Sequence, residues 1–229
     1  MKEKYKNFVK DSVLFKGIDP DDYDITQRIS MPVFNSFDKG ETVIGQDEIV
    51  RQIGIIISGT ILSVKLHRDG GSQIIDFLKR GEIIGLESTF STFTTSPCSL
   101  IANSQCSVVF ISCKKIFDSA DVTEACKGSI WQNITNLLSD ENIRRMHKID
   151  ILSKRGLRER INTFLEILTK KRNAATVDIG MTQEQFSQYL GVNRSALCKE
   201  LNTMKHEGLI EYRRSIYTVC KGFDPKSDN

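Results

Sequence analysis

Residues 182–210 read TQEQFSQYLGVNRSALCKELNTMKHEGLI, and this stretch predicts two short helices joined by a tight turn. Thr182 and Gln185 have the spacing of a capping box at the start of the first helix. Gly191 supplies the turn, because glycine adopts positive φ at little cost, and Asn193 can cap the second helix. Apolar residues recur at spacings of three and four on each helix: Phe186, Tyr189 and Leu190, then Leu197, Leu201 and Met204.

The second predicted helix carries a polar face opposite its apolar residues, made of Arg194, Ser195, Cys198, Lys199 and Asn202. Such a face suits the major groove of DNA, where arginine can donate two hydrogen bonds to guanine and serine can bond several base edges. The alternative is a helical hairpin with a solvated polar face. The agreement of both caps, the glycine and the two apolar faces favours a DNA-reading helix-turn-helix.

Residues 209–219 predict a β-hairpin after this pair, with Arg213 and Arg214 near its tip. A basic hairpin in this position is a wing, placed to touch phosphates. We therefore predict DNA contacts from Thr182, Asn193, Arg194, Ser195, Cys198, Lys199, Asn202, Arg213 and Arg214.

Composition and charge are those of a soluble protein with room for two domains: 229 residues, 39% hydrophobic and 27% charged. The charge is unevenly placed, since residues 151–229 hold 14 Lys and Arg against 9 Asp and Glu. The basic excess thus coincides with the predicted DNA-reading pair. The N-terminus has no apolar core of a signal peptide, and no apolar run is long enough to span a membrane. We expect a cytoplasmic protein that does not enter membranes.

The cysteines form no C-x-x-C pair, and no histidine stands near one at zinc-finger spacing. We therefore expect no metal site and six free thiols. Cys198 is the thiol whose oxidation could change DNA contact. The three histidines are scattered, and no Ser-His-Asp set or Gly-rich phosphate loop is present, so we do not expect an enzyme.

Short β-rich runs alternate with glycine turns before residue 113. The runs are residues 41–44, 53–58, 61–67, 73–78, 83–86, 99–103 and 107–112. Strands at roughly 8–12-residue spacing suggest an antiparallel sandwich or barrel, and the Asp-Gly-Gly turn at 69–71 predicts a hairpin. We expect a β domain over residues 1–120, including a helical lead-in at 1–30.

Residues 121–155 predict one long helix, interrupted by no proline. About 30 residues make a helix about 45 Å long, too long for one small domain to bury. We therefore expect an apolar stripe to pack on its copy in a second subunit, through Ile130, Ile134, Leu137, Leu138, Glu141, Arg145, Ile149 and Leu152. Within that stripe, Glu141 and Arg145 form either an ion pair or a polar contact to an effector. Gly156 then offers a break, and residues 156–229 form the DNA-binding domain.

This order of parts resembles the CRP/FNR superfamily of bacterial transcription regulators. The resemblance is carried by KGETVI at 39–44, ISGT at 57–60, GEIIG at 81–85, and GVNRS at 191–195 with Leu201. It implies an α+β fold: an N-terminal antiparallel β-roll of the double-stranded β-helix or jelly-roll type, a long dimerisation helix, and a C-terminal winged helix-turn-helix.

The chain departs from the superfamily's cyclic-AMP binders in the effector pocket. Those proteins place Gly-Glu after a Gly-x-x-x-Gly turn and Arg-Ser or Arg-Thr on the facing strand. Here Leu86 takes the acid's place, and no arginine lies between Arg80 and Arg144. A cyclic phosphate would lack its bidentate partner, so we do not expect cyclic AMP to bind. The matching pocket positions are Gly85, Leu86, Glu87, Ser96, Pro97, Arg145 and Met146.

The resemblance implies no cofactor. The iron–sulfur branch uses cysteines near the N-terminus, and none precedes Cys98 here. A haem sensor would need an axial ligand from the roll, where the only histidine, His67, is better suited to a hairpin end on the surface. The reader helix also departs, since Ser195 stands where many members have a glutamate that reads a base. The half-site of the best-known members is therefore not expected.

From these patterns we expect a homodimeric, sequence-specific DNA-binding transcription regulator acting on a palindrome. Its β-roll would sense an unknown signal, and RNA polymerase would be a further partner by resemblance. The alternative is an orphan regulator without an effector, whose DNA binding is set by its abundance or by thiol redox state. The sequence names neither the small-molecule effector nor the operator.

Overall fold

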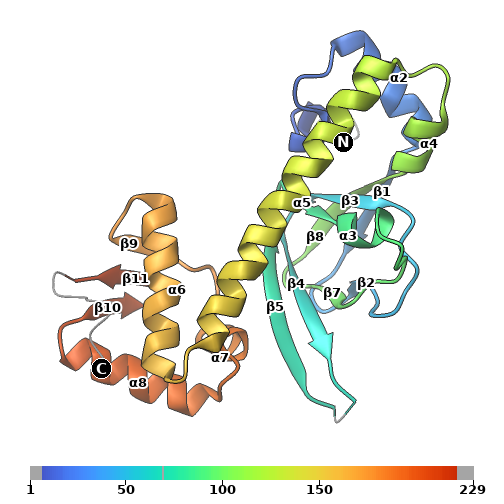
Figure 1. Ribbon diagram of the computed structural model, residues 1–229. Coiled ribbons are helices and arrows are strands. Elements are labelled where there is room, and N and C mark those ends of the chain that lie inside the picture. Colours follow the sequence, from blue (N-terminus) through green and yellow to red (C-terminus); the bar gives the residue numbers. More distant parts are fainter. Residues whose placement is uncertain (1–6, 69, 221–229) are drawn as a thin grey trace. The chain divides into compact units, whose positions relative to one another are not determined.

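A computed structural model describes residues 7–68 and 70–220 (Figure 1). The chain divides into two compact units, Met1–Glu141 and Asn142–Asn229, so the boundary falls inside its longest helix. The predicted fold class is confirmed: two antiparallel sheets, a long helix and a C-terminal winged helix-turn-helix follow one another. Parts of three sequence predictions lie outside the described residues: the first six residues of the lead-in, Asp69 of the predicted turn, and the tail after Cys220.

The first unit holds two antiparallel four-stranded sheets. One contains β1 (Val33–Phe37), β8 (Cys106–Ile111), β3 (Ile53–Ser58) and β6 (Ile83–Ile84), and the other β2 (Thr42–Ile44), β7 (Ser99–Ala102), β4 (Thr60–Leu66) and β5 (Ser72–Lys79). The predicted runs match β2 to β8 closely, and the hairpin of β4 with β5 is confirmed. Strand β1 was missed. The predicted run at 83–86 is too long, because Gly85 at φ 78° ends the strand and begins the short helix α3 (Leu86–Thr89).

Strand β3 is the centre of this unit because both of its faces are buried. Ile53, Ile55 and Ile57 point into one apolar cluster, together with residues of β8 and of the helices. Ile56 points into the second cluster, between the two sheets, where residues of β2, β4, β5 and β7 meet it. The run IGIII therefore is continuously apolar, as expected of a strand covered on both sides.

Three short helices and the start of a long one cover the first cluster: η1 (Val13–Phe15), α2 (Pro20–Ser30), α4 (Cys113–Asp118) and α5 (Glu124–Ser153). Ile130 and Ile134 of α5 are fully buried there, and Leu137 and Leu138 pack against the same cluster. Asn133 of α5 donates hydrogen bonds to the carbonyl oxygens of Leu14 (3.0 Å) and Lys16 (2.9 Å).

The prediction that Ile130 and Ile134 face a second subunit is therefore wrong. The N-terminal segments extend the unit's core along the first turns of α5, so one chain does bury them. The predicted single stripe was also wrong, because Ile130 and Ile149 lie 19 residues apart and so point about 100° away from each other on a helix. Ile149 is 66% exposed.

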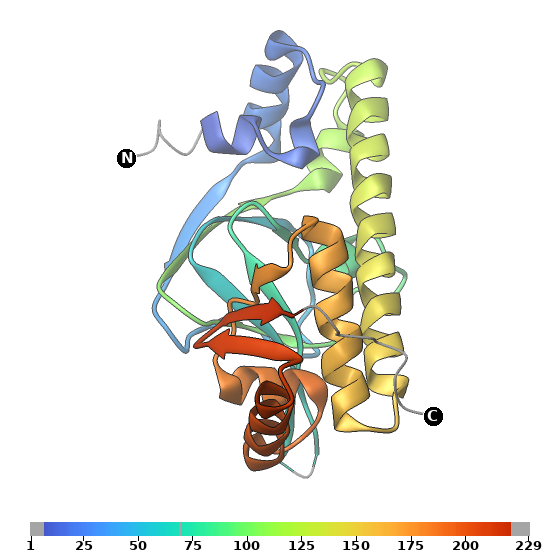
Figure 2. The same cartoon turned by 90° about the vertical axis from the view of Figure 1, so that its left-hand side faces the viewer.

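The second unit begins with the last turns of α5. It contains α6 (Leu157–Arg172), β9 (Thr176–Asp178), α7 (Gln183–Leu190), α8 (Arg194–His206), β10 (Ile210–Arg213) and β11 (Ile216–Val219). Figure 2 shows the β10–β11 hairpin that follows α8, and β9 adds a third, unpredicted strand in the order β10-β11-β9. Phe186 of α7 contacts Phe164 of α6 and Tyr217 of β11, so the aromatic rings join all layers of the core.

Candidate nucleic-acid interface

Helices α7 and α8 begin where the sequence predicts, and α7 ends at the predicted turn. The Thr182 hydroxyl accepts from the Gln185 amide (3.2 Å), and the Gln185 side chain accepts from the Thr182 amide (2.9 Å), which confirms the capping box. Gly191 has φ 67° and ends α7. The Asn193 side chain accepts from the Ala196 amide (2.8 Å) and so caps α8. Because both ends of the turn are fixed by hydrogen bonds, the direction of α8 relative to α7 is fixed as well.

The apolar face of α8 is buried and its polar face lies on the surface. Leu197, Leu201 and Met204 have no exposed area. The opposite side, which we name the reader face, consists of Arg194, Ser195, Cys198, Lys199 and Asn202; Cys198 is half-buried and the other four are exposed. The structure thus brings the predicted base-contacting residues together on one side of one helix.

Several reader-face side chains already make hydrogen bonds within the unit. Ser195 donates to the Asn193 side chain (2.9 Å), and the Cys198 thiol donates to the Gln183 side chain (3.3 Å). Tyr212 of β10 donates from its hydroxyl to the Asn202 side chain (2.8 Å). These bonds order the centre of the reader face. Arg194 and Lys199 provide its exposed cations.

The wing carries the last two predicted contacts. Arg213 ends β10, and Arg214 occupies the turn at φ 56°, a left-handed conformation rare for arginine. Both are exposed. The wing is also joined to α8, because Lys205 forms a 2.7 Å ion pair with Glu211, which raises the pKa of Lys205. The hairpin is therefore held beside the reader helix.

Sequence reasoning missed the ion-pair cluster behind α8. Arg158 of α6 donates to Glu200 (2.6 Å) and in a bidentate manner to Glu207 (2.8 and 3.0 Å). The hydrogen bonds to Glu207, and to a smaller extent the bond to Glu200, raise the pKa of Arg158. Glu200 and Glu207 are seven residues apart and so share a side of α8, but only the folded unit shows that a cation faces them.

Tyr217 of β11 is the buried residue of the wing, with no exposed area, and Tyr212 of β10 stacks on it with ring centroids 5.5 Å apart. Burial, and then the neighbouring Tyr212 and Cys198, raise the pKa of Tyr217. Its ring therefore acts as a neutral, rigid support for the residue that bonds Asn202.

The two pocket segments of the first unit lie next to each other. The Ser88 hydroxyl of α3 donates to the carbonyl oxygen of Thr95 (3.2 Å), the residue directly before the predicted Ser96-Pro97 position. Leu86 is buried in the apolar cluster, and the Ser96 hydroxyl donates to the Cys98 carbonyl (2.7 Å). Gly85 and Glu87 adjoin Leu86 at the start of α3. The Pro97 carbonyl accepts a hydrogen bond from the Lys65 ammonium (2.8 Å). The last two predicted pocket positions, Arg145 and Met146, are exposed on α5 and belong to the other unit.

Within residues 7–68 and 70–220, no group of three or more His, Cys, Asp or Glu side chains is placed to hold a metal ion. The cysteines there are free thiols, of which Cys106, Cys113 and Cys126 are buried. None of the helices in the described part of the chain has the length and apolarity needed to cross a membrane.

Comparisons with known proteins agree with this geometry. Residues 34–119 match the family model of the cyclic nucleotide-binding domain, and residues 159–221 match that of the Crp-like helix-turn-helix domain. Together the two matches span most of the β-roll and the whole of α7, α8 and the wing.

Curated relatives and solved structures extend the likeness over most of the chain. Electron transport regulator A of Shewanella oneidensis is 25% identical over 180 residues, 76% of this chain and 70% of that protein. The fumarate and nitrate reduction regulatory protein of Escherichia coli K12 is 22% identical over 186 residues, 79% of this chain and 72% of that protein. The structure of FixK2 from Bradyrhizobium japonicum has a TM-score of 0.63 at 18% identity, covering 82% of this chain and 92% of that one.

Proposed function

The chain belongs to the CRP/FNR superfamily of transcription regulators, and we propose that it acts as a homodimer that reads a palindromic operator. The observation that carries the proposal is the reader face, a largely exposed row of polar and cationic side chains on α8. The turn before α8 is fixed at both ends, by Gly191 at the end of α7 and by the Asn193 cap of α8. Two such helices related by a two-fold axis enter successive major grooves roughly 34 Å apart. The protein is a regulator, not an enzyme, and acts in the cytoplasm with RNA polymerase as a partner.

The dimer contact runs along the exposed side of α5. Met146 and Ile149 are 62% and 66% exposed, although both are large and apolar. Arg145, Ile149 and Leu152 follow one another at spacings of four and three, the repeat of a two-helix seam. The interface thus uses the second half of α5, and Leu138 and Glu141 lie on the helix just before it.

The DNA contacts divide by role. Arg194, Ser195, Cys198, Lys199 and Asn202 face base edges, and Arg213 and Arg214 touch phosphates. Thr182 and Asn193 sit at helix N-termini, where amide groups favour a phosphate. Selection of random duplex DNA by the purified protein, followed by affinity measurements at two salt concentrations, tests this division. Weak, sequence-blind binding under every condition would contradict the proposed reading function.

The β-roll responds to a signal other than cyclic AMP. Leu86 packs into the core where cyclic-AMP binders have an acid, and the hydroxyl and carbonyl groups at Ser96 and Pro97 are engaged within the chain. Because Ser96-Pro97 stands where those proteins have Arg-Ser or Arg-Thr, a phosphate there would lack the bidentate arginine of that position. Calorimetry with cyclic AMP should show no heat of binding, and micromolar affinity would refute this part of the proposal.

An orphan regulator without effector is the second candidate, favoured by the same missing arginine. The DNA selection separates the two. High affinity of the ligand-free protein for one palindrome favours an orphan regulator or one that a ligand releases, whereas weak binding rescued by a metabolite favours a sensor. The metabolite screen would target the β-roll and Arg145. If thiol redox state sets the DNA binding of an orphan regulator through Cys198, peroxide should change the DNA affinity of the wild-type protein. It should no longer change the DNA affinity of Cys198→Ser.

A further inference from the structure

We infer that Lys148, together with Arg160, is a positioning residue that fixes the direction of the reader helix relative to the last turns of α5. All groups involved lie within the second unit. The inference rests on the proposed function, because direction matters only if α5 joins two readers into a dimer.

The C-terminus of α7 is where this fixation occurs. The last four carbonyl groups of a helix have no partner within it. Here the Ser187 carbonyl accepts from the Val192 amide (3.0 Å) and the Gln188 carbonyl from the Gly191 amide (3.2 Å). The Tyr189 carbonyl accepts from the Lys148 ammonium, and the Leu190 carbonyl accepts from the Arg160 guanidinium (2.9 Å). Two cations from outside the helix pair therefore complete the end of α7.

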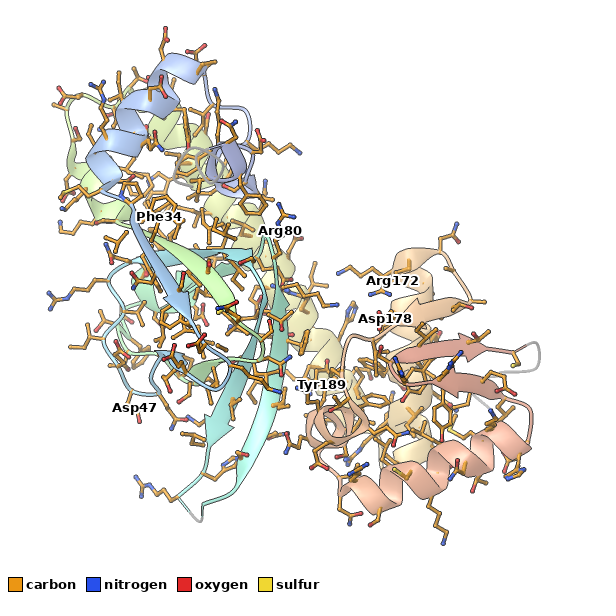
Figure 3. All side chains as sticks on the ribbon, turned by 180° about the vertical axis from the view of Figure 1, so that it is seen from behind. Phe34, Asp47, Arg80, Arg172, Asp178 and Tyr189 are labelled. Carbon is orange, nitrogen blue, oxygen red and sulfur yellow. The ribbon has the colours of Figure 1, made fainter. Side chains whose placement is uncertain are left out.

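Lys148 is unusual for a lysine on a long helix, because it is only 9% exposed. Its ammonium lies over the Tyr189 ring, 2.9 Å from the centroid, in addition to bonding the Tyr189 carbonyl. Figure 3 labels Tyr189 at this end of α7. Lysine is rarely buried without a specific partner. A ring face and a helix C-terminus both attract a positive charge, so the two contacts act together.

Arg160 joins the same point to the end of α5. Besides the Leu190 carbonyl, its guanidinium bonds the Lys154 carbonyl (3.0 Å), one residue past the end of α5. The connection between α5 and α6 contains Gly156 in an extended conformation, and its amide donates to the Glu159 carboxylate (3.2 Å). This bond caps α6 and does not reach α7. Ile151 adds apolar burial here, but such contact has no direction. The hydrogen bonds of Lys148 and Arg160 supply the direction.

The consequence is a preference for one half-site spacing. We name the bonds from Lys148 and Arg160 to the Tyr189 and Leu190 carbonyls the clamp. Residues 191–193 follow directly from this end of α7 and lead into α8. An angular change at Tyr189 therefore changes the direction of α8 in both subunits of a dimer. Loosening the clamp leaves each reader intact but lets the distance between the two readers vary. Base preference within a half-site would then stay, while selectivity for the spacer between half-sites would fall.

The test measures full-length protein on palindromes whose half-site, obtained by selection, is held constant while the spacer varies by one or two base pairs. Lys148→Met keeps the side-chain length and removes the charge and the bond; Arg160→Met removes the neighbouring bond; Lys148→Arg restores a donor. Lys170→Met removes one exposed charge of the same unit and is the matched control. We expect both clamp variants to lose about tenfold in spacer selectivity, as the loss of a charged hydrogen bond implies.

Half-site selectivity, measured against one substituted base pair, should stay within about twofold, because the reader face is untouched. Lys148→Arg should recover most of the spacer selectivity, and Lys170→Met should keep all of it. Folded clamp variants with wild-type spacer selectivity would overturn the inference alone. A wild-type protein that binds isolated half-sites as well as palindromes would overturn the proposed dimeric function, and this inference with it.

Discussion

Arg194 is the first residue of α8 and stands at the exposed start of the reader face. If it bonds a guanine edge in a bidentate manner, Arg194→Ala should cost roughly 1–3 kcal/mol of binding free energy and relax specificity at one base pair. Competition assays with single-base variants of the selected operator measure both effects. An equal loss on every sequence would instead assign Arg194 to a phosphate.

Gly59 is a position where two constraints coincide. It has φ 81°, and a Cβ built on it would lie 2.3 Å from the Gln105 carbonyl oxygen and 2.6 Å from Cys106 Cβ. Gly81 has φ 89° but meets nothing within 4 Å. Gly81→Ala should therefore cost about 1 kcal/mol of unfolding free energy from backbone strain, and Gly59→Ala roughly 3 kcal/mol or more, since packing strain is added. Urea unfolding of the pair checks this difference, and equal losses would rule out the steric cause.

Cys113 makes stability depend on alkaline pH. Burial raises the pKa of its thiol from 9.0 to about 12. Between these values the unfolded chain releases the proton and the folded chain keeps it, so unfolding free energy falls as pH rises from about 9 to about 12, by up to about 1.4 kcal/mol per pH unit. Cys113→Ala should show a shallower fall, with a remainder from the other groups whose pKa burial raises: Tyr23 (to about 12), Tyr217, Cys106 and Cys126. Parallel pH profiles of the two proteins would count against the assignment.

At the scale of elements, α6 is fastened to the reader helix by Arg158. Its partners Glu200 and Glu207 are partly exposed, so screening reduces what the cluster contributes. Arg158→Met should lower the unfolding free energy by about 1–2 kcal/mol, because it removes the bidentate partner of Glu207 and the single hydrogen bond to Glu200. Lys170→Met, which breaks the exposed ion pair with Glu166, should cost less than about 0.5 kcal/mol. Adding Glu207→Gln to Arg158→Met should cost little more, and full additivity would show that the two groups do not interact.

The elements also show which parts of the molecule were predictable from sequence. The helix-turn-helix was, because Thr182, Gly191 and Asn193 act through bonds to residues within three positions. Strands β2 to β8 were predictable as well, because glycine turns separate several of the β-rich runs, whereas β1 (Val33–Phe37) was missed. The burial of Ile130 was not predictable, since its cluster includes residues more than a hundred positions earlier, such as Leu14. The bond from Lys148 to Tyr189 was not predictable either, because in the sequence nothing distinguishes Lys148 from an exposed lysine of a long helix.

At the scale of the whole molecule, the decisive property is whether two chains act together. A dimer binds the second half-site at the high effective concentration that its first contact creates, so subunit loss lowers operator affinity far more than half-site affinity. Ile149→Asp places a charge in the proposed seam, at a side chain already 66% exposed and therefore not required by the fold of one chain. His147→Asp, exposed on another side of α5, is the control.

Sedimentation should show that Ile149→Asp is monomeric and His147→Asp dimeric. Operator affinity of the monomer should fall by a factor of about 100 or more, whereas affinity for an isolated half-site should stay within about twofold. Ile134 is buried and Ile149 is not, so the first turns of α5 complete the core of one chain, whereas the side of the last turns that carries Ile149 is exposed. That exposed side is the one that we propose meets a second chain. An Ile149→Asp protein that remains a dimer would place the subunit contact elsewhere and leave the second half of α5 without a partner.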